Sequence, residues 1–365
     1  MQDELYYQLA LTMIPELGPV RCRMLTEYFG TASAVFTAKK KEISRIEGIG
    51  DFSAAAIKKW DGFDEVEKEL AFIGQQQIRT FFITDTGYPK RLLHCYDPPT
   101  LIFYKGNTDL NNNRVLSIIG TRNHTAYGKE VTEQIIREIS REGIVIISGL
   151  AFGIDSLAHR AALQNGMPTI GVLAHGLDTL YPPQNKSMAK EMLLQGGLLT
   201  EFRKNTKPDK HNFPKRNRIV AGMSDATIVI ETASKGGSMI TAELAYNYNR
   251  DLFAIPGKIN DQKSSGCLQL IKQNKAVLLT DAKQLLETLG WIEKKKNIRK
   301  QKELFIELSI EEQKIVSFLT GKDAVPIDSI FLETGLSSST IAAAILNLEI
   351  QNIITVLPGK MYRLT

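Results

Sequence analysis

The stretch that decides the fold covers residues 115–149 and reads VLSIIGTRNHTAYGKEVTEQIIREISREGIVIISG. It begins with the apolar run Val115–Ile119 and ends with a second run, Ile144–Ile147, and a glycine follows each run within two residues. The intervening segment 127–142 has charged residues on one side and apolar residues at helical spacing on the other, namely Val131, Ile135, Ile136 and Ile139. Continuous apolar strands joined by an amphipathic helix predict parallel strands that are covered on both faces.

The same alternation of short apolar runs and helical segments extends from about residue 78 to about residue 290. The other expected strands are Thr80–Ile83, Leu101–Tyr104, Thr169–Leu173, Leu198–Phe202, Ala226–Ile230, Leu252–Ile255 and Ala276–Leu279. We therefore expect an α/β fold with a Rossmann-like, doubly wound and mainly parallel sheet, in a domain that covers residues 75–292.

Residues 1–74 have the pattern of short helices separated by turns, which predicts a helical domain. Segments 14–20 and 46–52 each place an apolar residue and a glycine before a new helix, as helix-hairpin-helix (SAM-like) motifs do. Such a hairpin presents backbone N–H groups to a nucleic-acid phosphate, whereas in a helical bundle the same glycines only permit tight turns. The turn is favoured slightly, because Asp51 lies where a phosphate would approach.

The C-terminal part divides into a basic linker and a small domain. Residues 293–304 are highly charged, which is typical of a solvated tether. Residues 305–365 contain three helical segments (311–319, 327–334 and 338–347) and then two strand segments (353–357 and 361–364), with Pro358-Gly359 between the strands. This is the order of a winged helix. Its third helix contains no lysine or arginine, so we favour a protein-docking or packing role over DNA reading.

Composition restricts the class of protein. The 365 residues suggest two or three domains, and 43% apolar with 23% charged residues is typical of a soluble globular chain. A net charge of +5 means that any electropositive surface must be local. The sequence has no signal-peptide pattern and no run long enough for a membrane helix. The three cysteines, Cys22, Cys95 and Cys267, are far apart and are expected to be reduced and buried, so we expect a cytoplasmic protein.

Four polar segments lie next to the expected strands: Gly120-Thr121-Arg122, Ser148–Gly153, Phe213–Arg218 and Gly236-Gly237-Ser238. Because the carboxyl ends of parallel strands meet at one sheet edge, we expect these segments to lie close together. Glycines let the backbone approach an anion, helix N-termini offer N–H groups, and arginines form bidentate phosphate contacts. The sequence therefore predicts a phosphate-binding site at this edge.

Other chemistries lack their motifs. The sequence has no P-loop, the Ser148–Gly153 loop departs from the dinucleotide-binding pattern, and no cluster of Cys and His fits a metal site. We therefore expect no cofactor and no metal. Asp155 and His159 are one helical turn apart, and their spacing permits a hydrogen bond that serves either to fix the helix or for acid–base chemistry.

Taken together, these segments resemble the DNA-processing protein A (DprA/Smf) family. The resemblance rests on residues 117–122, 148–155, 213–222 and 236–238, and also on 87–89, 97–99 and 253–257. It implies a bacterial protein that binds single-stranded DNA, protects incoming DNA, forms a homodimer and loads the RecA recombinase in natural transformation and recombination. The resemblance implies no catalytic residue, and single-strand-binding protein is a further expected partner. We expect the dimer surface at strand 276–279 and helix 282–289, with core packing as the alternative for Leu285, Leu286 and Leu289.

Single-strand binding without sequence preference requires a cationic groove and a platform for the bases. The candidate cations are Arg122, Lys215, Arg216 and Arg218, some of which alternation in an extended segment would turn inward. Asn217 is expected to contact a phosphate, sugar or base, and Phe213 is either a stacking face or part of the core. The expected backbone or hydroxyl donors are Gly120, Thr121, Ser148, Gly149, Gly153, Gly236, Gly237 and Ser238.

Two alternatives stay open at this level. An arginine and Glu243 near the two glycines also resemble nucleotide phosphoribohydrolases of the lysine-decarboxylase-like family. However, Met239-Ile240 replaces the glycine-threonine pair of that family, and residues 231–235 lack its proline. A pure protein scaffold would account for the winged helix but would leave the cationic segments without a role.

Overall fold

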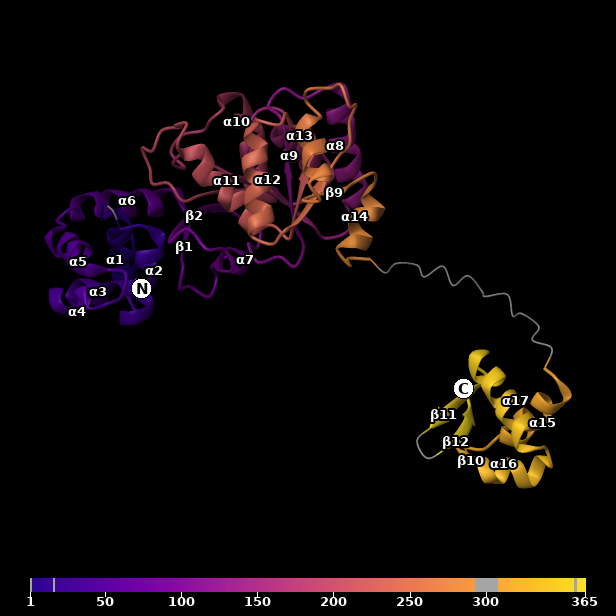
Figure 1. Cartoon of the computed structure of the whole chain (residues 1–365). Helices are drawn as coiled ribbons and strands as arrows, with labels where there is room; N and C mark the ends of the chain where they lie inside the picture. The colour runs from indigo at the N-terminus through magenta and orange to yellow at the C-terminus, as the bar shows by residue number, and fades with distance from the viewer. Residues whose placement is uncertain (1, 16, 293–307, 358–359) are drawn as a thin grey trace. The chain divides into compact units, whose positions relative to one another are not determined.

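The computed structural model of the chain describes residues 2–15, 17–292, 308–357 and 360–365. The chain divides into two compact units at residues 293–294, and each unit is described by itself (Figure 1). The basic linker predicted at residues 293–304 and the turn predicted at residues 358–359 lie outside the described residues. The fold class expected from the sequence is confirmed: a mostly parallel nine-stranded sheet, an N-terminal helical region and a C-terminal winged helix.

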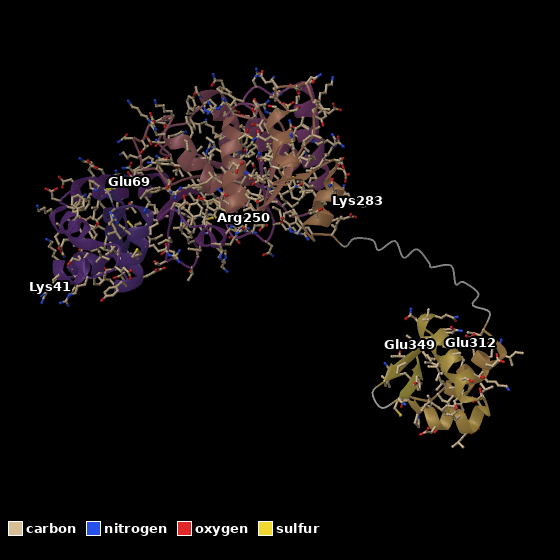
Figure 2. All side chains as sticks on the ribbon, in the orientation of Figure 1. Lys41, Glu69, Arg250, Lys283, Glu312 and Glu349 are labelled. Atoms are coloured by element: carbon tan, nitrogen blue, oxygen red, sulfur yellow. The ribbon has the colours of Figure 1, made fainter. Side chains whose placement is uncertain are left out.

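Six helices form the N-terminal region: α1 (Gln2–Met13), α2 (Pro19–Phe29), α3 (Ala32–Thr37), α4 (Lys40–Ser44), α5 (Gly50–Lys59) and α6 (Phe63–Gln76). Gly18 precedes α2 and Gly50 begins α5, so both glycine segments lie at helix starts as predicted. The predicted boundary at residues 74–75 falls inside α6. Near that point the carboxylate of Glu69, labelled in Figure 2, accepts a hydrogen bond from the Lys204 backbone N–H at 3.1 Å and thereby joins α6 to the sheet region.

The sheet has the strand order β1-β2-β6-β5-β4-β3-β7-β8-β9. Its strands are β1 (Arg79–Phe82), β2 (Leu101–Gly106), β3 (Val115–Ile119), β4 (Val145–Ser148), β5 (Thr169–Val172), β6 (Gly196–Thr200), β7 (Ala226–Val229), β8 (Asp251–Ala254) and β9 (Val277–Leu278). All neighbouring pairs from β6 to β9 are parallel. The chain order reverses around β3, which is the topological switch point where ligands bind in doubly wound sheets.

Helices cover both faces of the sheet, as the continuous apolar strands predicted. Within β3, Leu116 and Ile118 face the core formed with α8 (Ala126–Ile139), α9 (Ile154–Gln164) and α14 (Ala282–Thr288). Val115 and Ile119 face the opposite core, which is formed with α11 (Asn212–Met223), α12 (Gly237–Asn247) and α13 (Ser265–Lys272). Because successive side chains of a strand point to opposite faces, each face has its own apolar layer. A further helix, α10 (Lys186–Gln195), packs beside β6 after the short 3-10 helix η1 (Pro183–Asn185).

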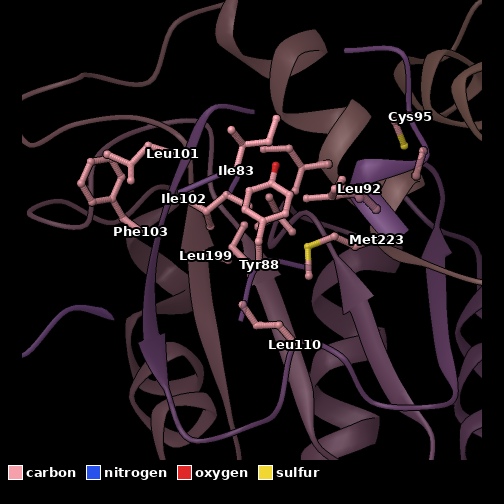
Figure 3. Close-up of a cluster of buried hydrophobic side chains, with 14 of the residues drawn as sticks. Ile83, Tyr88, Leu92, Cys95, Leu101, Ile102, Phe103, Leu110, Leu199 and Met223 are labelled. Carbon is pink, nitrogen blue, oxygen red and sulfur yellow. The ribbon is translucent and has the colours of Figure 1, made fainter. Parts of the chain in front are cut away.

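Two predicted strands pair in a direction that the sequence pattern did not indicate. β1 pairs with β2 antiparallel, and β2 pairs with β6 antiparallel, so the sheet gains an antiparallel edge. The part of the chain between β1 and β2 contains the short helix α7 (Lys90–Leu93) and a buried tyrosine, Tyr88. Tyr88 packs among Leu92, Ile102, Leu199 and neighbouring apolar side chains (Figure 3), and its hydroxyl donates to the Pro99 carbonyl at 2.5 Å. This bond joins the two motif segments around residues 88 and 99.

The C-terminal unit is a winged helix with its own core. It contains α15 (Ile310–Leu319), β10 (Val325–Pro326), α16 (Ile327–Thr334), α17 (Ser338–Ile350), β11 (Ile354–Leu357) and β12 (Met361–Leu364). The three helices and the β11–β12 pair agree with the predicted order, while the two-residue strand β10, paired with β12, was not predicted. Ser337 caps α17 by accepting from the Thr340 N–H.

Among the described helices, none is by itself both long and apolar enough to cross a membrane. Only α16 and α17 taken together satisfy the length and composition required, and they are bent by 116° at their junction. The three cysteines are unpaired and buried, as predicted.

Candidate nucleic-acid interface

A cleft of about 490 Å³ lies at the sheet edge where β3, β4 and β7 end. Because Ile119 pairs with Val229 in register, the loops after β3 and β7 leave the sheet side by side. Ten of the residues proposed from the sequence line this cleft: Gly120, Thr121, Arg122, Gly149, Phe213, Arg216, Asn217, Gly236, Gly237 and Ser238. The four polar segments therefore come together, while Ser148, Gly153, Lys215 and Arg218 lie outside the lining.

The loop after β3 is fixed by its neighbours. The Thr121 N–H donates to the Glu231 carbonyl at 2.7 Å, and the Thr121 carbonyl accepts from the Ile154 N–H at 3.1 Å. Gly153 has φ +80°, and a Cβ at that residue would lie 2.2 Å from the Thr121 carbonyl oxygen. Only glycine therefore permits the loops after β3 and β4 to pack this closely.

Arg122 is the exposed cation of this loop. Its guanidinium carbon lies 5.2 Å from the centre of the half-buried Phe213 ring, which is a cation–π distance. The contact holds the guanidinium at the lining of the cleft. A guanidinium that rests on a ring has less conformational freedom to lose when it binds an anion. Phe213 is thus half-buried and also lines the cleft, so its two alternative roles, stacking face and core residue, both stay open.

The segment Phe213–Arg218 is the first turns of helix α11, and the expectation of an extended segment was wrong. Arg216, Ile219, Val220 and Met223 are all buried, at the helical spacing of i, i+3, i+4 and i+7. The helical period, not strand alternation, thus turns part of the basic segment inward.

Arg216 is buried beneath the cleft. Its Nη1 donates to the Gly149 carbonyl and, at 2.6 Å, to the Val172 carbonyl. A Cβ on Gly149 would lie 2.3 Å from that nitrogen, so a side chain at residue 149 would displace the guanidinium. Burial lowers the pKa of Arg216 to about 10, partly opposed by Asp155, so the side chain remains charged at neutral pH. Burial also raises the pKa of Asp155, while Arg216 and three hydrogen-bond donors act against this increase.

Arg218 turns away from the cleft into an ion-pair cluster. Its guanidinium pairs with Glu201 and donates to the Asp97 carbonyl, and its Nη1 lies 3.6 Å from Asp97 Oδ2. The hydroxyl of Tyr248 donates to the same Asp97 carboxylate. The side chains of Arg218 and Glu201 are only 12% and 13% exposed, so this guanidinium is engaged within the protein.

Two lysines near α11 are exposed: Lys215, within the helix, and Lys210, in the loop before it. Lys210 lines the cleft, whereas Lys215 does not. Asn217 lines it as well, and its Oδ1 accepts from Arg216 Nε at 3.1 Å, so its amide is oriented by the buried guanidinium.

Helix α12 begins at Gly237, and its first residues line the cleft. Its N-cap residue Gly236 has no side-chain capping bond, and the open space around Gly237 leaves the first turn accessible. Ser238 Oγ donates to Thr232 Oγ1 at 2.7 Å, so its hydroxyl is engaged within the protein. An uncapped helix N-terminus that lines a cleft with Arg122 favours an anion.

Three further residues considered from the sequence, Ser148, Asp155 and His159, have hydrogen-bond partners within the protein. Ser148 lies at the end of β4, where its hydroxyl donates to the Ile118 carbonyl at 2.6 Å, so it supports the sheet. Asp155 and His159 bond to different partners: Asp155 accepts from the Gly149 N–H at 3.1 Å, and His159 Nδ1 lies 2.7 Å from Thr169 Oγ1. His159 is fully buried, and burial lowers its pKa to about 3, so the imidazole is a neutral structural group.

Other residues line the cleft but were not in the predicted binding set, among them Asp155, Lys210, Pro214, Thr232 and Thr241. Lys210 had a signal: it lies one helical turn before Phe213, at the entrance to α11. Asp155 had only the weaker signal of an acid at the start of a helix that follows a glycine.

The comparisons with known proteins agree with this architecture. Residues 79–290 match the family model of DNA recombination-mediator protein A, and residues 305–360 match the DprA winged helix domain. The chain belongs to this DprA/Smf family. The chain is 31% identical to the protein Smf of Synechocystis sp., over 99% of both chains. It is 41% identical to the DNA processing protein DprA of Bacillus subtilis, over 62% of this chain and 76% of that one.

Two solved structures of family members are similar to this chain. The DNA processing protein A of Streptococcus pneumoniae superposes with a TM-score of 0.68 and 35% identity, over 77% of this chain and 96% of that one. The DNA processing protein A of Helicobacter pylori, whose structure concerns a unique single-stranded DNA binding mode, superposes with a TM-score of 0.53 and 34% identity. The match covers 58% of this chain and 95% of that one.

Proposed function

We propose that this DprA/Smf protein binds single-stranded DNA in the cleft and acts as a recombination mediator that protects incoming DNA and loads the RecA recombinase. The observation that supports this most directly is Arg122, an exposed cation oriented by Phe213 beside the uncapped N-terminus of α12. The Helicobacter pylori relative, described by its single-stranded DNA binding mode, supports the choice of ligand.

The lining of the cleft favours phosphate contacts over base reading. Arg122 and Lys210 supply charge, and the first turn of α12 supplies backbone N–H groups. Groups of this kind bind the sugar-phosphate backbone of any sequence, because phosphates are common to all nucleotides. We therefore propose binding that depends strongly on salt and weakly on sequence.

Binding without catalysis is the proposed mode of action. In the alternative phosphoribohydrolase an arginine and a glutamate must act together on one N-glycosidic bond. Here Glu243 lies outside the cleft lining and pairs with Lys275, whose Nζ is 2.7 Å from Glu243 Oε2. Arg216 is bound beneath the cleft by carbonyl groups. The two residues therefore have separate structural partners, and no observation favours the hydrolase.

A homodimer is the proposed assembly, with the edge strand β9 at its surface. Val277 and Leu278 are 46% and 39% exposed, on the last strand of the sheet. An exposed apolar edge strand tends to pair with another chain. Leu285 and Leu286 are buried in the core, so core packing accounts for them, and Leu289 is partly buried there. Two linked sites would bind one strand more tightly than one site does.

The experiment that tests the mediator function measures RecA filament assembly on a single strand coated with single-strand-binding protein. We expect faster assembly with the wild-type protein, a smaller acceleration with Arg122→Ala, and a dimer in light scattering. The proposed site of action is the bacterial cytoplasm, where the RecA filament forms. An equal rate of assembly with and without the protein would contradict the mediator function while leaving DNA binding to be measured separately.

A further inference from the structure

A group of exposed aromatic rings lies next to the cleft. A shallow recess is lined by Phe152, Tyr181, Phe213, His175 and Arg122, and it shares Phe213 and Arg122 with the cleft. Tyr181 is 43% exposed and Phe152 is 40% exposed. Aromatic rings beside a cationic groove are the usual platform for the bases of a single strand, because every base has a π-face.

Phe213 is less suited to this role than its neighbours. Its ring is half-buried and is already in contact with the Arg122 guanidinium. The Tyr181 ring lies 6.3 Å from it, centre to centre, with an angle of 53° between the ring planes. This tilt excludes face-to-face stacking of the two rings, so part of the Tyr181 ring remains open for a base.

The position of Tyr181 is fixed through its backbone. Its N–H donates to His175 Nε2 at 3.1 Å, and His175 Nδ1 lies 2.9 Å from the Gly176 carbonyl. An accepting Nε2 and a donating Nδ1 correspond to the neutral imidazole, and burial lowers the pKa of His175 in agreement with that state. The backbone at Tyr181 is therefore fixed before any ligand binds, which lowers the entropy lost on binding.

We propose that Tyr181, together with Phe152, forms a base-stacking platform that continues the cleft, so that a strand with a phosphate at Arg122 places the next bases over these rings. This proposal rests on the single-stranded DNA binding proposed above and adds a second class of contact to it. Phosphate contacts at Arg122 supply affinity that decreases with salt, whereas stacking on Tyr181 supplies affinity that needs bases and is almost independent of salt.

The test measures the affinity of the full-length protein for a fluorescent oligothymidine by anisotropy, at several salt concentrations. Tyr181→Ala should bind between about fivefold and a hundredfold more weakly, with an unchanged salt slope because no cation is lost. Tyr181→Phe keeps the ring and should bind within about twofold of wild type. Tyr246→Ala is the matched control, because Tyr246 is 45% exposed on α12 and lies outside the cleft and recess linings.

A strand of abasic sugar-phosphate units of the same length separates stacking from phosphate binding. We expect wild type and Tyr181→Ala to bind this strand equally. The platform is overturned if Tyr181→Ala binds oligothymidine as tightly as wild type does. It is also overturned if Tyr181→Ala binds the abasic strand more weakly than wild type, or if the substitution makes the salt slope shallower. Wild-type binding that Arg122→Ala weakens and Tyr181→Ala does not would leave the proposed function intact and remove only the platform. A wild type that binds no single strand would overturn both.

Discussion

The guanidinium of Arg122 lies 5.2 Å from the centre of the Phe213 ring, so the loop after β3 and the first turn of α11 present one oriented cation to the cleft. The two residues are far apart in the sequence and meet because the loop after β3 and the start of α11 line the same cleft. Arg122 is exposed, whereas Arg216 and Arg218 are engaged by protein groups. Arg122 is therefore the arginine of the predicted set that is best placed for a phosphate.

Arg122→Ala should weaken binding to single-stranded DNA about equally for all sequences. The loss of one phosphate contact should also make the slope of log K against log salt concentration shallower by about 0.7. Arg137→Ala is the control, because Arg137 is exposed near the C-terminal end of α8, at the other edge of the sheet. Anisotropy titrations at several salt concentrations measure both quantities. An unchanged slope in a folded Arg122→Ala protein would place the phosphate site elsewhere.

Arg218→Ala should destabilise the fold by about 3 kcal/mol, because it leaves the Glu201 carboxylate buried without its partner. Burial already raises the pKa of Glu201, and Arg218 opposes that increase. Lys215→Ala removes an exposed lysine of the same helix and should change stability by less than about 0.5 kcal/mol. Urea unfolding of the two variants measures the difference. Equal stability of both variants would show that the Arg218 cluster contributes little.

Stability should decrease in mild acid because of His159. Its pKa in the folded protein is about 3, below the ordinary value of 6.5, so between these values the unfolded chain binds a proton that the folded chain does not. The contribution of His159 to the free energy of unfolding is complete above pH 6.5 and is lost as the pH falls below that value. The raised pKa of Asp155 has the opposite effect on stability as the pH falls. The effect of His159 is therefore measured by comparing wild type with a His159 variant.

From pH 7 to pH 5.5, the unfolding free energy of wild type should fall by about 1 kcal/mol more than that of His159→Asn. The asparagine retains a polar group near Thr169, which limits the other consequences of the change. Parallel slopes for the two proteins would mean that His159 titrates normally in the folded state.

Much of the fold follows from patterns that are visible in the sequence. Runs such as Ile144–Ile147 are buried on both sides and therefore apolar throughout, which predicts a covered parallel sheet. The antiparallel pairing of β2 with β6 was not predicted, because the direction of a strand depends on distant partners and not on local spacing. The strand β10 has only two residues, too few to show a period.

The position of the cleft was predictable from the sequence, and the direction of several side chains was not. Glycines after β3 and β4 mark the sheet edge, and the cleft lies there. Arg216 and Arg218 were expected to be cations of the groove because they belong to a basic run. The spacing of Arg216 with Ile219, Val220 and Met223 already contained the helical signal that turns Arg216 inward. The partners of Arg218 come from distant segments, around residues 97 and 201, and have no local signal.

Removal of the winged helix should leave most of the affinity for oligonucleotides. Residues 305–365 contain four basic and seven acidic residues, and α17 contains no lysine or arginine, so this unit is not expected to attract DNA. Its core is separate from those of the first unit, so a protein of residues 1–304 should fold. Anisotropy of the truncated and full-length proteins at equal salt measures the effect. A tenfold loss in a folded, dimeric fragment would show that the winged helix contacts DNA.

The most direct test of single-stranded DNA binding is an anisotropy titration of the wild-type protein with a single-stranded oligonucleotide and, in parallel, with a duplex of the same length. An assay for hydrolysis of nucleoside monophosphates accompanies it. We expect tight, salt-dependent binding of single strands of unrelated sequence, weaker binding of the duplex, and no hydrolysis. A protein that binds no single strand at low salt and cleaves nucleoside monophosphates would contradict the account and favour the enzyme.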